Sequence, residues 1–322
     1  MRRDTFLKSL AAFAAAGSLP LPALPALSAP AVRITIPAGA GGGWDTTGRA
    51  LGSAMREAGV ADAVSYANLP GAAGALGLAQ FINGAKGDPN AMLVMGAVML
   101  GGIIIRRPPV NLSQITAVAR VASEYNVFVL PAGSPLKNMA DVIAQFRQDP
   151  ASVKWGGGSR GSTEHIAAAM IARAVGVDPA RLDYVPFAGG GEAAAAILSG
   201  AVTVGGSGYS EFAEPIRAGK MKAIAVTSGA RLQGIDVPTL REQGIDVEIG
   251  NWRGVYGAPG ITFDQRAALI DRVKAALETS AWRRSLQANG WTPALLTGAA
   301  FDRFVDQEFA SLRATMARAG IV

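Results

Sequence analysis

Short apolar segments alternate with amphipathic segments along most of the 322-residue chain. β-branched and apolar runs predict strands at residues 32–36, 63–66, 92–95, 115–121, 127–130, 153–155, 183–185, 202–204 and 222–226. Apolar positions at helical spacing predict helices at 45–58, 73–83, 163–175, 192–198 and 211–217, and a helical C-terminal part at 263–277, 282–288 and 301–319. Strands that alternate with helices are typical of an α/β fold with mainly parallel sheets.

One further helix shows its start signal in the sequence. Asn138 precedes a segment that carries Met139, Val142 and Phe146 on one helical face. Asparagine is a favoured N-cap residue, and Asp141 would place a negative charge in the first turn, where the helix dipole favours it. We therefore predict that a helix begins directly after Asn138.

The first 29 residues have the pattern of a secretory signal peptide. Arg2 and Arg3 give a basic start, residues 10–16 form an Ala-rich apolar run, and prolines with small residues follow. The paired arginines suggest the twin-arginine variant of such a signal. A membrane anchor is the alternative, but a span needs roughly 20 apolar residues and prolines interrupt this run. We expect residues 1–29 to be removed and the mature protein to be periplasmic.

Composition excludes several kinds of site. The chain has no Cys and one His, His165, so disulfides, iron–sulfur clusters, thiolate nucleophiles and His-rich metal sites are ruled out. Its length predicts about two domains of ordinary size. The net charge is +6, and residues 1–29 carry three basic groups and one acidic group, so the mature chain has a net charge of +4. Because the arginines are dispersed, we expect no nucleic-acid partner.

Three Gly-rich turns fall where a predicted strand leads into a predicted helix, at 37–46, 156–163 and 187–192. Open α/β sheets bind ligands at this edge, where helix N-termini present free N–H groups and a positive dipole. Glycines let a ligand approach the backbone closely, and such a site prefers a carboxylate or a phosphate. The alternative is that the glycines only shape the turns. Three such loops at equivalent places favour the ligand site over this alternative more than one loop would.

Enzyme motifs do not account for these loops. None ends in Gly-Lys-Ser/Thr as a Walker loop does, and Trp44 stands where a dinucleotide-binding loop needs its third glycine. Residues 157–161 match Gly-x-Ser-x-Gly, yet the single histidine lies only six residues beyond Ser159, inside the next helix. We therefore expect no enzyme and no cofactor, and we expect His165 at a helix surface or a lobe interface. Glu211 and Glu214 lie one helical turn apart, and we expect this pair to be solvated.

Four motifs in the same order resemble the tripartite tricarboxylate transporter substrate-binding proteins, the TctC-like or Bug extracytoplasmic receptors. They are residues 36–51, 68–74, 237–244 and 252–260, and the resemblance covers nearly the whole mature chain. The version Gly43-Trp44-Asp45-Thr46 is more similar to the tricarboxylate-receptor branch than to the amino-acid-binding branch.

The resemblance implies a two-lobed periplasmic-binding-protein type II fold that closes on its ligand by a hinge motion. Lobe 1 would comprise residues 32–125 and 252–322, and lobe 2 residues 126–251. It also implies a monomeric receptor for a small di- or tricarboxylate such as citrate, serving the membrane permease subunits of a tripartite transporter. An amino-acid or aromatic-acid receptor and a sensory partner remain open as alternatives, and an exported serine hydrolase as a distant one. The ligand-binding residues that the resemblance implies are Ala40, Gly41, Gly42, Trp44, Asp45, Thr46, Ala97, Gly158, Ser159, Arg160, Ser162, Thr163, Ala188, Gly189 and Tyr209.

Three of these residues have more than one interpretation. Asp45 would repel an anionic ligand, so we expect it to act as a helix N-cap, with a bridging water or a ligand ammonium as its other possible partners. Trp44 would cover the ligand or pack at the hinge. Arg160 would favour a second or third ligand carboxylate if it points into the cleft, and a smaller ligand if it points outward.

Overall fold

The computed structural model describes residues 29–322. The predicted signal peptide, residues 1–29, lies outside the described residues except for its last position. Within residues 29–322, no helix combines the length and the apolar character that a membrane crossing requires.

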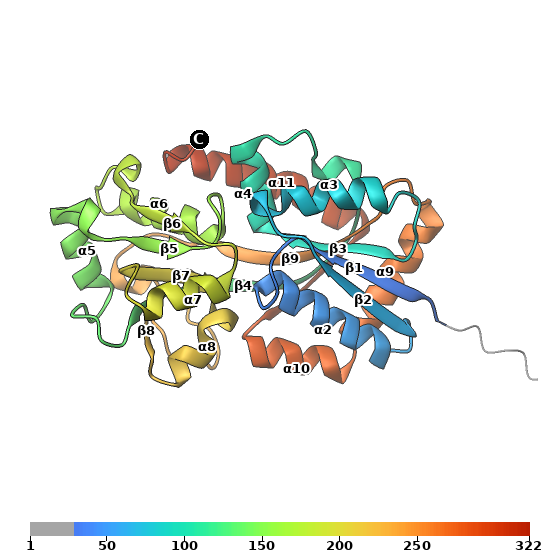
Figure 1. Ribbon diagram of the computed structural model, residues 1–322, viewed down its shortest axis with the longest axis horizontal. Coiled ribbons are helices and arrows are strands. Elements are labelled where there is room, and N and C mark those ends of the chain that lie inside the picture. Colours follow the sequence, from blue (N-terminus) through green and yellow to red (C-terminus); the bar gives the residue numbers. More distant parts are fainter. Residues whose placement is uncertain (1–28) are drawn as a thin grey trace, which may run out of the picture.

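The first lobe is a parallel α/β unit (Figure 1). The first elements of this lobe are β1 (Ala31–Ile36), α2 (Gly43–Glu57), β2 (Ala63–Asn68), the 3-10 turn η1 (Ala72–Gly74), α3 (Ala75–Gly84), β3 (Ala91–Gly96), α4 (Ala97–Arg106) and η2 (Leu112–Gln114). Strand β1 lies between β2 and β3 and is parallel to both. All six residues of β3 are buried, which explains why this strand appears in the sequence as an uninterrupted apolar run.

Two long strands connect the lobes. β4 (Thr116–Pro131) pairs antiparallel with β9 (Gly250–Gly257) in the first lobe and with β7 (Val204–Gly208) and β8 (Met221–Val226) in the second. The prediction of two separate strands at 115–121 and 127–130 was therefore wrong, and β9 was not predicted as a strand. Polar residues interrupt the apolar pattern in the middle of β4, but Glu124 is buried there in an ion pair with Arg253 of β9.

The crossing strands are antiparallel, whereas the other strands of each lobe keep the predicted parallel order. In the first lobe these are β1–β3, and in the second they are β5 (Trp155–Gly157), β6 (Tyr184–Pro186) and β7.

The second lobe repeats the α/β pattern on the other side of these strands (Figure 1). It consists of α5 (Met139–Gln148), η3 (Pro150–Ser152), β5 (Trp155–Gly157), α6 (Thr163–Ala174), η4 (Pro179–Arg181), β6 (Tyr184–Pro186), α7 (Gly190–Leu198), β7 (Val204–Gly208), α8 (Tyr209–Arg217), β8 (Met221–Val226) and η5 (Arg241–Gln243). The predicted cap of α5 is confirmed, because the Asn138 side chain accepts a hydrogen bond from the Asp141 N–H at 2.9 Å.

The C-terminal part returns to the first lobe as α9 (Phe263–Leu277), α10 (Ser280–Asn289), β10 (Thr292–Thr297) and α11 (Gly298–Arg318). The three predicted helices are confirmed, but β10, which lies between two of them, was not predicted. This strand pairs antiparallel with the first-lobe part of β4, and half-exposed or exposed side chains occupy all six of its positions. An edge strand of this kind has no buried face, so it lacks the alternation that strand prediction requires.

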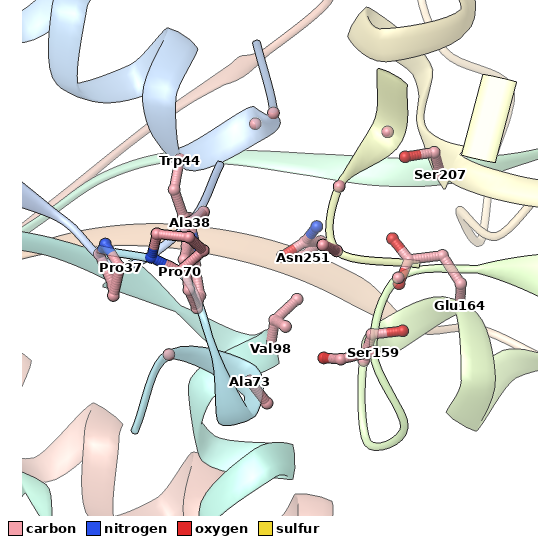
Figure 2. Close-up of a pocket in the computed structure, with 18 of the residues that line it drawn as sticks. Pro37, Ala38, Trp44, Pro70, Ala73, Val98, Ser159, Glu164, Ser207 and Asn251 are labelled. Carbon is pink, nitrogen blue, oxygen red and sulfur yellow. The ribbon is translucent and has the colours of Figure 1, made fainter. Parts of the chain in front are cut away.

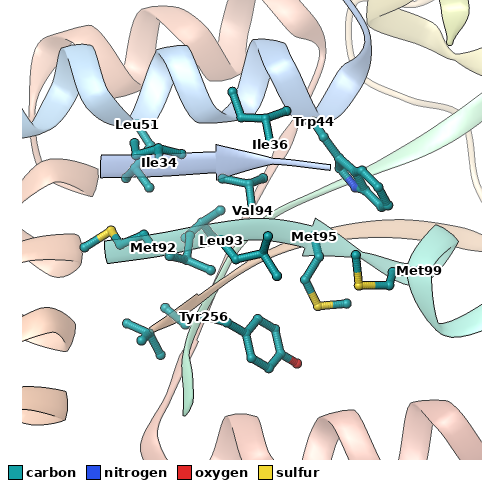
Figure 3. Close-up of a cluster of buried hydrophobic side chains, with 14 of the residues drawn as sticks. Ile34, Ile36, Trp44, Leu51, Met92, Leu93, Val94, Met95, Met99 and Tyr256 are labelled. Carbon is teal, nitrogen blue, oxygen red and sulfur yellow. The ribbon is translucent and has the colours of Figure 1, made fainter. Parts of the chain in front are cut away.

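Each lobe has its own hydrophobic core. In the first lobe, Ile34 and Ile36 of β1 pack with Leu51 of α2 and with β3 (Figure 3). In the second lobe, Trp155 packs edge-on against Phe128 and Phe146. The predicted lobe boundaries, near 125 and 251, fall inside β4 and at the start of β9, so the crossing strands belong to both lobes. The boundaries themselves stay a prediction.

Candidate ligand-binding cleft

A cavity of about 210 Å³ lies between the two lobes (Figure 2). First-lobe residues line it on one side, including Pro37, Pro70, Ala73 and Val98. Second-lobe residues line the opposite side, and Asn251 and Arg253 of β9 line the part where the lobes join. The sides come from loops that follow strand ends, which is where the sequence placed the Gly-rich turns.

Seven of the fifteen predicted site residues line this cavity. They are Gly42, Trp44, Gly158, Ser159, Ser162, Ala188 and Gly189. The other eight lie outside its lining, and they are Ala40, Gly41, Asp45, Thr46, Ala97, Arg160, Thr163 and Tyr209. Contact with a ligand remains a prediction for all fifteen.

The cavity lies at the N-termini of five helices. Gly42 caps α2, Ser162 caps α6 and Gly189 caps α7, and all three line the cavity. Helices α4 and α8 also begin here and contribute Val98 and Glu211. Because the first N–H groups of a helix lack intrahelical partners and carry the positive end of its dipole, this arrangement favours a negative group in the cavity.

Asp45 supports the first loop from behind the cavity. Its carboxylate accepts hydrogen bonds from the Gly41 N–H at 2.9 Å and from Asn68 Nδ2 at 3.0 Å, and it forms an ion pair with Arg49 at 2.9 Å. Burial alone would raise the pKa of Asp45, but these bonds outweigh it and hold the pKa below its ordinary value. The predicted N-cap role was wrong, because Gly42 is the cap and Asp45 lies inside the first turn.

The hydroxyl and indole groups of the first loop are also turned toward the protein. Thr46 Oγ1 donates to the Gly42 carbonyl at 3.2 Å within its own helix. Trp44 is 6% exposed and packs in the first-lobe core beside Met95 and Met99, as Figure 3 shows, while part of its ring lines the cavity. Trp44 therefore packs as a core residue of lobe 1 and forms one side of the cavity at the same time.

The second-lobe loop is held by a buried aromatic pair. The ring of His165 lies 4.5 Å from that of Tyr184, and its Nδ1 accepts the Gly161 N–H at 3.2 Å. Tyr184 donates to the Gly158 carbonyl at 2.8 Å. Burial, together with the charge of Arg160, lowers the pKa of His165 to about 4. His165 is thus a buried loop support and not a surface residue, and among the described hydrogen bonds none joins it to Ser159.

Arg160 is exposed and does not line the cavity. Its Nη2 donates to the Tyr184 backbone carbonyl at 3.1 Å. The sequence left open whether Arg160 points into the cleft or outward. In the structure its guanidinium does not line the cavity.

Glu164 is one of two acidic residues of the second lobe that line the cavity (Figure 2). It lies in the first turn of α6, its residue is 5% exposed, and its Oε2 has no hydrogen-bond partner. Burial raises its pKa to about 7 and the negative charge of Glu211 adds to the rise, while the Ser162 hydroxyl and the backbone N–H of Glu164 oppose it. A buried carboxyl that has no ion pair among the described residues can interact with a group that the ligand supplies.

Glu211 also faces the cavity, which corrects the prediction of a solvated pair with Glu214. Its Oε1 accepts the Gly43 N–H of the first lobe at 3.1 Å, and its Oε2 accepts Ser207 Oγ at 2.5 Å. Burial raises the pKa of Glu211, although these hydrogen bonds oppose the rise. An internal carboxylate thus occupies the N-terminus of α2, where the sequence alone placed a ligand carboxylate.

A buried ion pair fixes the inner end of the cavity. Arg253 of β9 pairs with Glu124 of β4, and Glu124 also accepts from Trp291 Nε1 at 3.0 Å and Ser210 Oγ at 3.2 Å. The guanidinium lies against Gly43, where a Cβ atom would overlap it. Arg253 is therefore already neutralised, and it supplies no free counter-charge to Glu164 or Glu211.

Several residues that line the cavity were not predicted from the sequence. They are Pro70, Gly71, Ala72, Ala73, Gly74, Val98, Arg106, Glu164, Ser207, Glu211, Asn251 and Arg253. For Glu164 a signal was available, because it follows Ser162 in the first turn after a Gly-rich loop. For Glu211 there was none, since its contact with Gly43 joins residues that are 168 positions apart.

Comparison with known proteins agrees with this geometry. A family model described as the tripartite tricarboxylate transporter family receptor, TctC, matches residues 48–321. A UPF0065 protein of Agrobacterium vitis is 25% identical over 298 residues, which are 90% of this chain and 84% of that protein.

Solved structures share the fold. The periplasmic binding protein BugD matches with a TM-score of 0.82 and 23% identity, over 90% of this chain and 98% of its own. MatC of Rhodopseudomonas palustris, solved with bound malate, matches with a TM-score of 0.77 and 22% identity, over 91% of this chain and 99% of its own. The predicted two-lobed fold is thereby confirmed. With a family match that covers most of its length, this chain belongs to the TctC family of tripartite tricarboxylate transporter receptors.

Proposed function

We propose that this protein is a periplasmic receptor that captures a small organic acid between its lobes and delivers it to the membrane permease of a tripartite transporter. The observation that carries the proposal is the cavity at five helix N-termini, lined by both lobes. Such a site suits a ligand carboxylate. The basic, Ala-rich segment at residues 1–29 supports export.

Malate, which the related MatC binds, makes C4 dicarboxylates the first candidates, with citrate and other tricarboxylates in the same panel. A thermal-shift screen of ligand-stripped protein tests the proposal. A ligand at about 100 times its Kd adds roughly 2.7 kcal/mol to stability, which corresponds to a rise of about 5 °C in Tm. If no organic acid, with or without further groups, raised the Tm, the receptor proposal would be refuted.

A cavity-filling variant shows whether ligand binds at this place. Val98→Phe replaces a small side chain that lines the cavity with a larger aromatic ring, so we expect the ligand no longer to raise the Tm. Leu76→Phe, on α3 at a position 55% exposed, is the matched control and should keep the shift. Delivery is tested by uptake of the labelled ligand into membrane vesicles that contain the permease, with and without the receptor.

A further inference from the structure

The two sides of the cleft differ in charge. The second-lobe side carries two acids, Glu164 and Glu211, and within the described part of the chain neither forms an ion pair. The basic residues nearby do not compensate them, since Arg253 is paired with Glu124 and Arg160 does not line the cavity. Arg106 lines the cavity but is an exposed residue at the end of α4.

The two acids differ in how well their oxygens are satisfied. Glu211 accepts from Gly43 and Ser207, so its place at the helix N-termini is stabilised by donors of the protein. Glu164 is almost fully buried, and its Oε2 has no hydrogen-bond partner, although the nearby Ser162 hydroxyl lowers the pKa of the carboxyl in part. A buried carboxyl without an ion pair costs free energy, which a ligand that supplies a further donor and the opposite charge would recover.

We propose that Glu164, with Glu211 beside it, binds an ammonium group of the ligand, so that the captured acid is an amino acid or another amino-bearing organic acid. This inference rests on the proposed receptor function and names the ligand class. An ammonium group has three donors, and the side chains that line this part of the cavity offer acceptors for them: Glu164, the hydroxyls of Ser159 and Ser207, and the Asn251 carboxamide (Figure 2). A plain tricarboxylate would instead bring further negative charge toward two acids.

Calorimetric titration of matched ligand pairs tests the inference. The pairs differ by one amino group: aspartate and succinate, glutamate and glutarate, 4-aminobutyrate and butyrate. In at least one pair we expect the amino-bearing acid to bind at least about tenfold more tightly than its partner. In Glu164→Gln that preference should shrink to about threefold or less. Glu214→Gln, at an exposed position on the same helix as Glu211, should keep it.

The pH dependence of binding separates two ways in which Glu164 can act. The titratable and charged groups around it are Glu211 on α8, His165 on α6, Tyr184 on β6, Arg160 in the loop, Arg106 on α4 and Arg253 on β9. His165 and Tyr184 stay neutral between pH 6 and 8, because burial lowers the pKa of one and raises that of the other. Since an ammonium binds to the ionised carboxyl, affinity should rise about tenfold across this range.

The opposite outcomes are distinct. Affinity that falls as the pH rises would overturn the inference, because it would mean that a protonated Glu164 donates to a ligand carboxylate. Equal binding within every pair, or an unchanged preference in Glu164→Gln, would overturn it as well and leave the receptor function intact. If no acid of any pair bound, the inference would be contradicted, and the receptor function would be contradicted only if malate, citrate and the rest of the thermal-shift panel also failed to bind.

Discussion

The two sides of the cleft are built from the same kind of strand-to-helix loop, yet they present different chemistry. Apart from Arg106 at its edge, the first-lobe side that precedes β4 consists of backbone and small or apolar side chains such as Ala38, Pro70, Ala73 and Val98. The second-lobe side presents hydroxyls and carboxyls. The first lobe therefore sets the shape of the cavity, and the second lobe sets most of the polar interactions that a ligand can make.

Acidic residues make the contrast clear. Asp45 in the first lobe is paired with Arg49 and holds the loop, and its pKa lies below the ordinary value. Glu164 in the second lobe has no ion pair among the described residues, and burial raises its pKa to about 7. One acid is part of the scaffold, and the other is the acid that we propose to contact the ligand. Four substitutions, two of them at these acids, test the contrast between the two sides of the cleft.

Replacing Glu164 should give the largest effect. Its folded-state pKa lies above the ordinary value of 4.5, so the folded protein keeps a proton that the unfolded chain loses. The stability of the wild-type protein should therefore fall as the pH rises from about 4.5 to about 7. Glu164→Gln removes this loss and should be more stable than wild type by about 3 kcal/mol at pH 8.

Urea unfolding of the ligand-free proteins measures this effect. The difference between the two proteins should disappear near pH 4, and exposed Glu214→Gln should follow the wild type throughout. A Glu164→Gln protein that is less stable at pH 8 would show that the carboxylate is satisfied in the native protein.

The backbones of the two lobes approach each other closely at Gly101 and Gly161. A Cβ atom at Gly101 of α4 would overlap the Gly161 carbonyl of the second lobe. We expect Gly101→Ala to weaken ligand affinity about 30-fold or more, because the lobes can no longer meet. The unliganded protein should keep its stability, since alanine is favoured over glycine inside a helix by about 1 kcal/mol.

Calorimetry measures the loss of affinity, and small-angle scattering should show that the ligand no longer makes the molecule more compact. Gly84→Ala, at the end of α3 where a Cβ atom has open space, is the control. Normal affinity in Gly101→Ala would show that the lobes need not touch here.

Asp45 should affect stability more than ligand choice. Asp45→Ala removes the acceptor of Gly41 and Asn68 and the partner of Arg49, and we expect a loss of about 2 kcal/mol at pH 7. The loss should shrink as the pH falls through the lowered pKa of Asp45, because the wild-type carboxylate then becomes protonated too. Urea unfolding provides the measurement, with Asp271→Ala at an exposed position of α9 as the control. A changed preference between ligands would contradict a purely structural role.

Ser159 should have the smallest effect. Its hydroxyl lines the cavity, so Ser159→Ala should weaken binding about fivefold, which is the worth of one hydrogen bond. Ser65→Ala, at an exposed position of β2, should bind as the wild type does. Calorimetry distinguishes these values, and unchanged binding in Ser159→Ala would show that the ligand is held elsewhere on the second-lobe side.

Much of the fold was predictable because it depends on local patterns. The strand at 91–96 is buried on both faces and the helix at 263–277 has a clear cap, so both appear in the sequence. β10 and the centre of β4 were missed, because an exposed edge and a buried ion pair both break the expected alternation. The Gly-rich loops correctly indicated the cleft, but not which acids face it.

The sequence by itself determined the alternation of strands and helices, the apolar runs that form the core of each lobe, and the Gly-rich turns at strand ends. It also excluded thiol and multi-histidine chemistry, since no Cys and one His are present. Only the tertiary structure decided that Asp45 is bound to Arg49 while Glu164 and Glu211 face the cavity. The physical reason is that burial and ionisation of an acid depend on partners distant in sequence, such as Gly43 for Glu211, and local patterns carry no information about them.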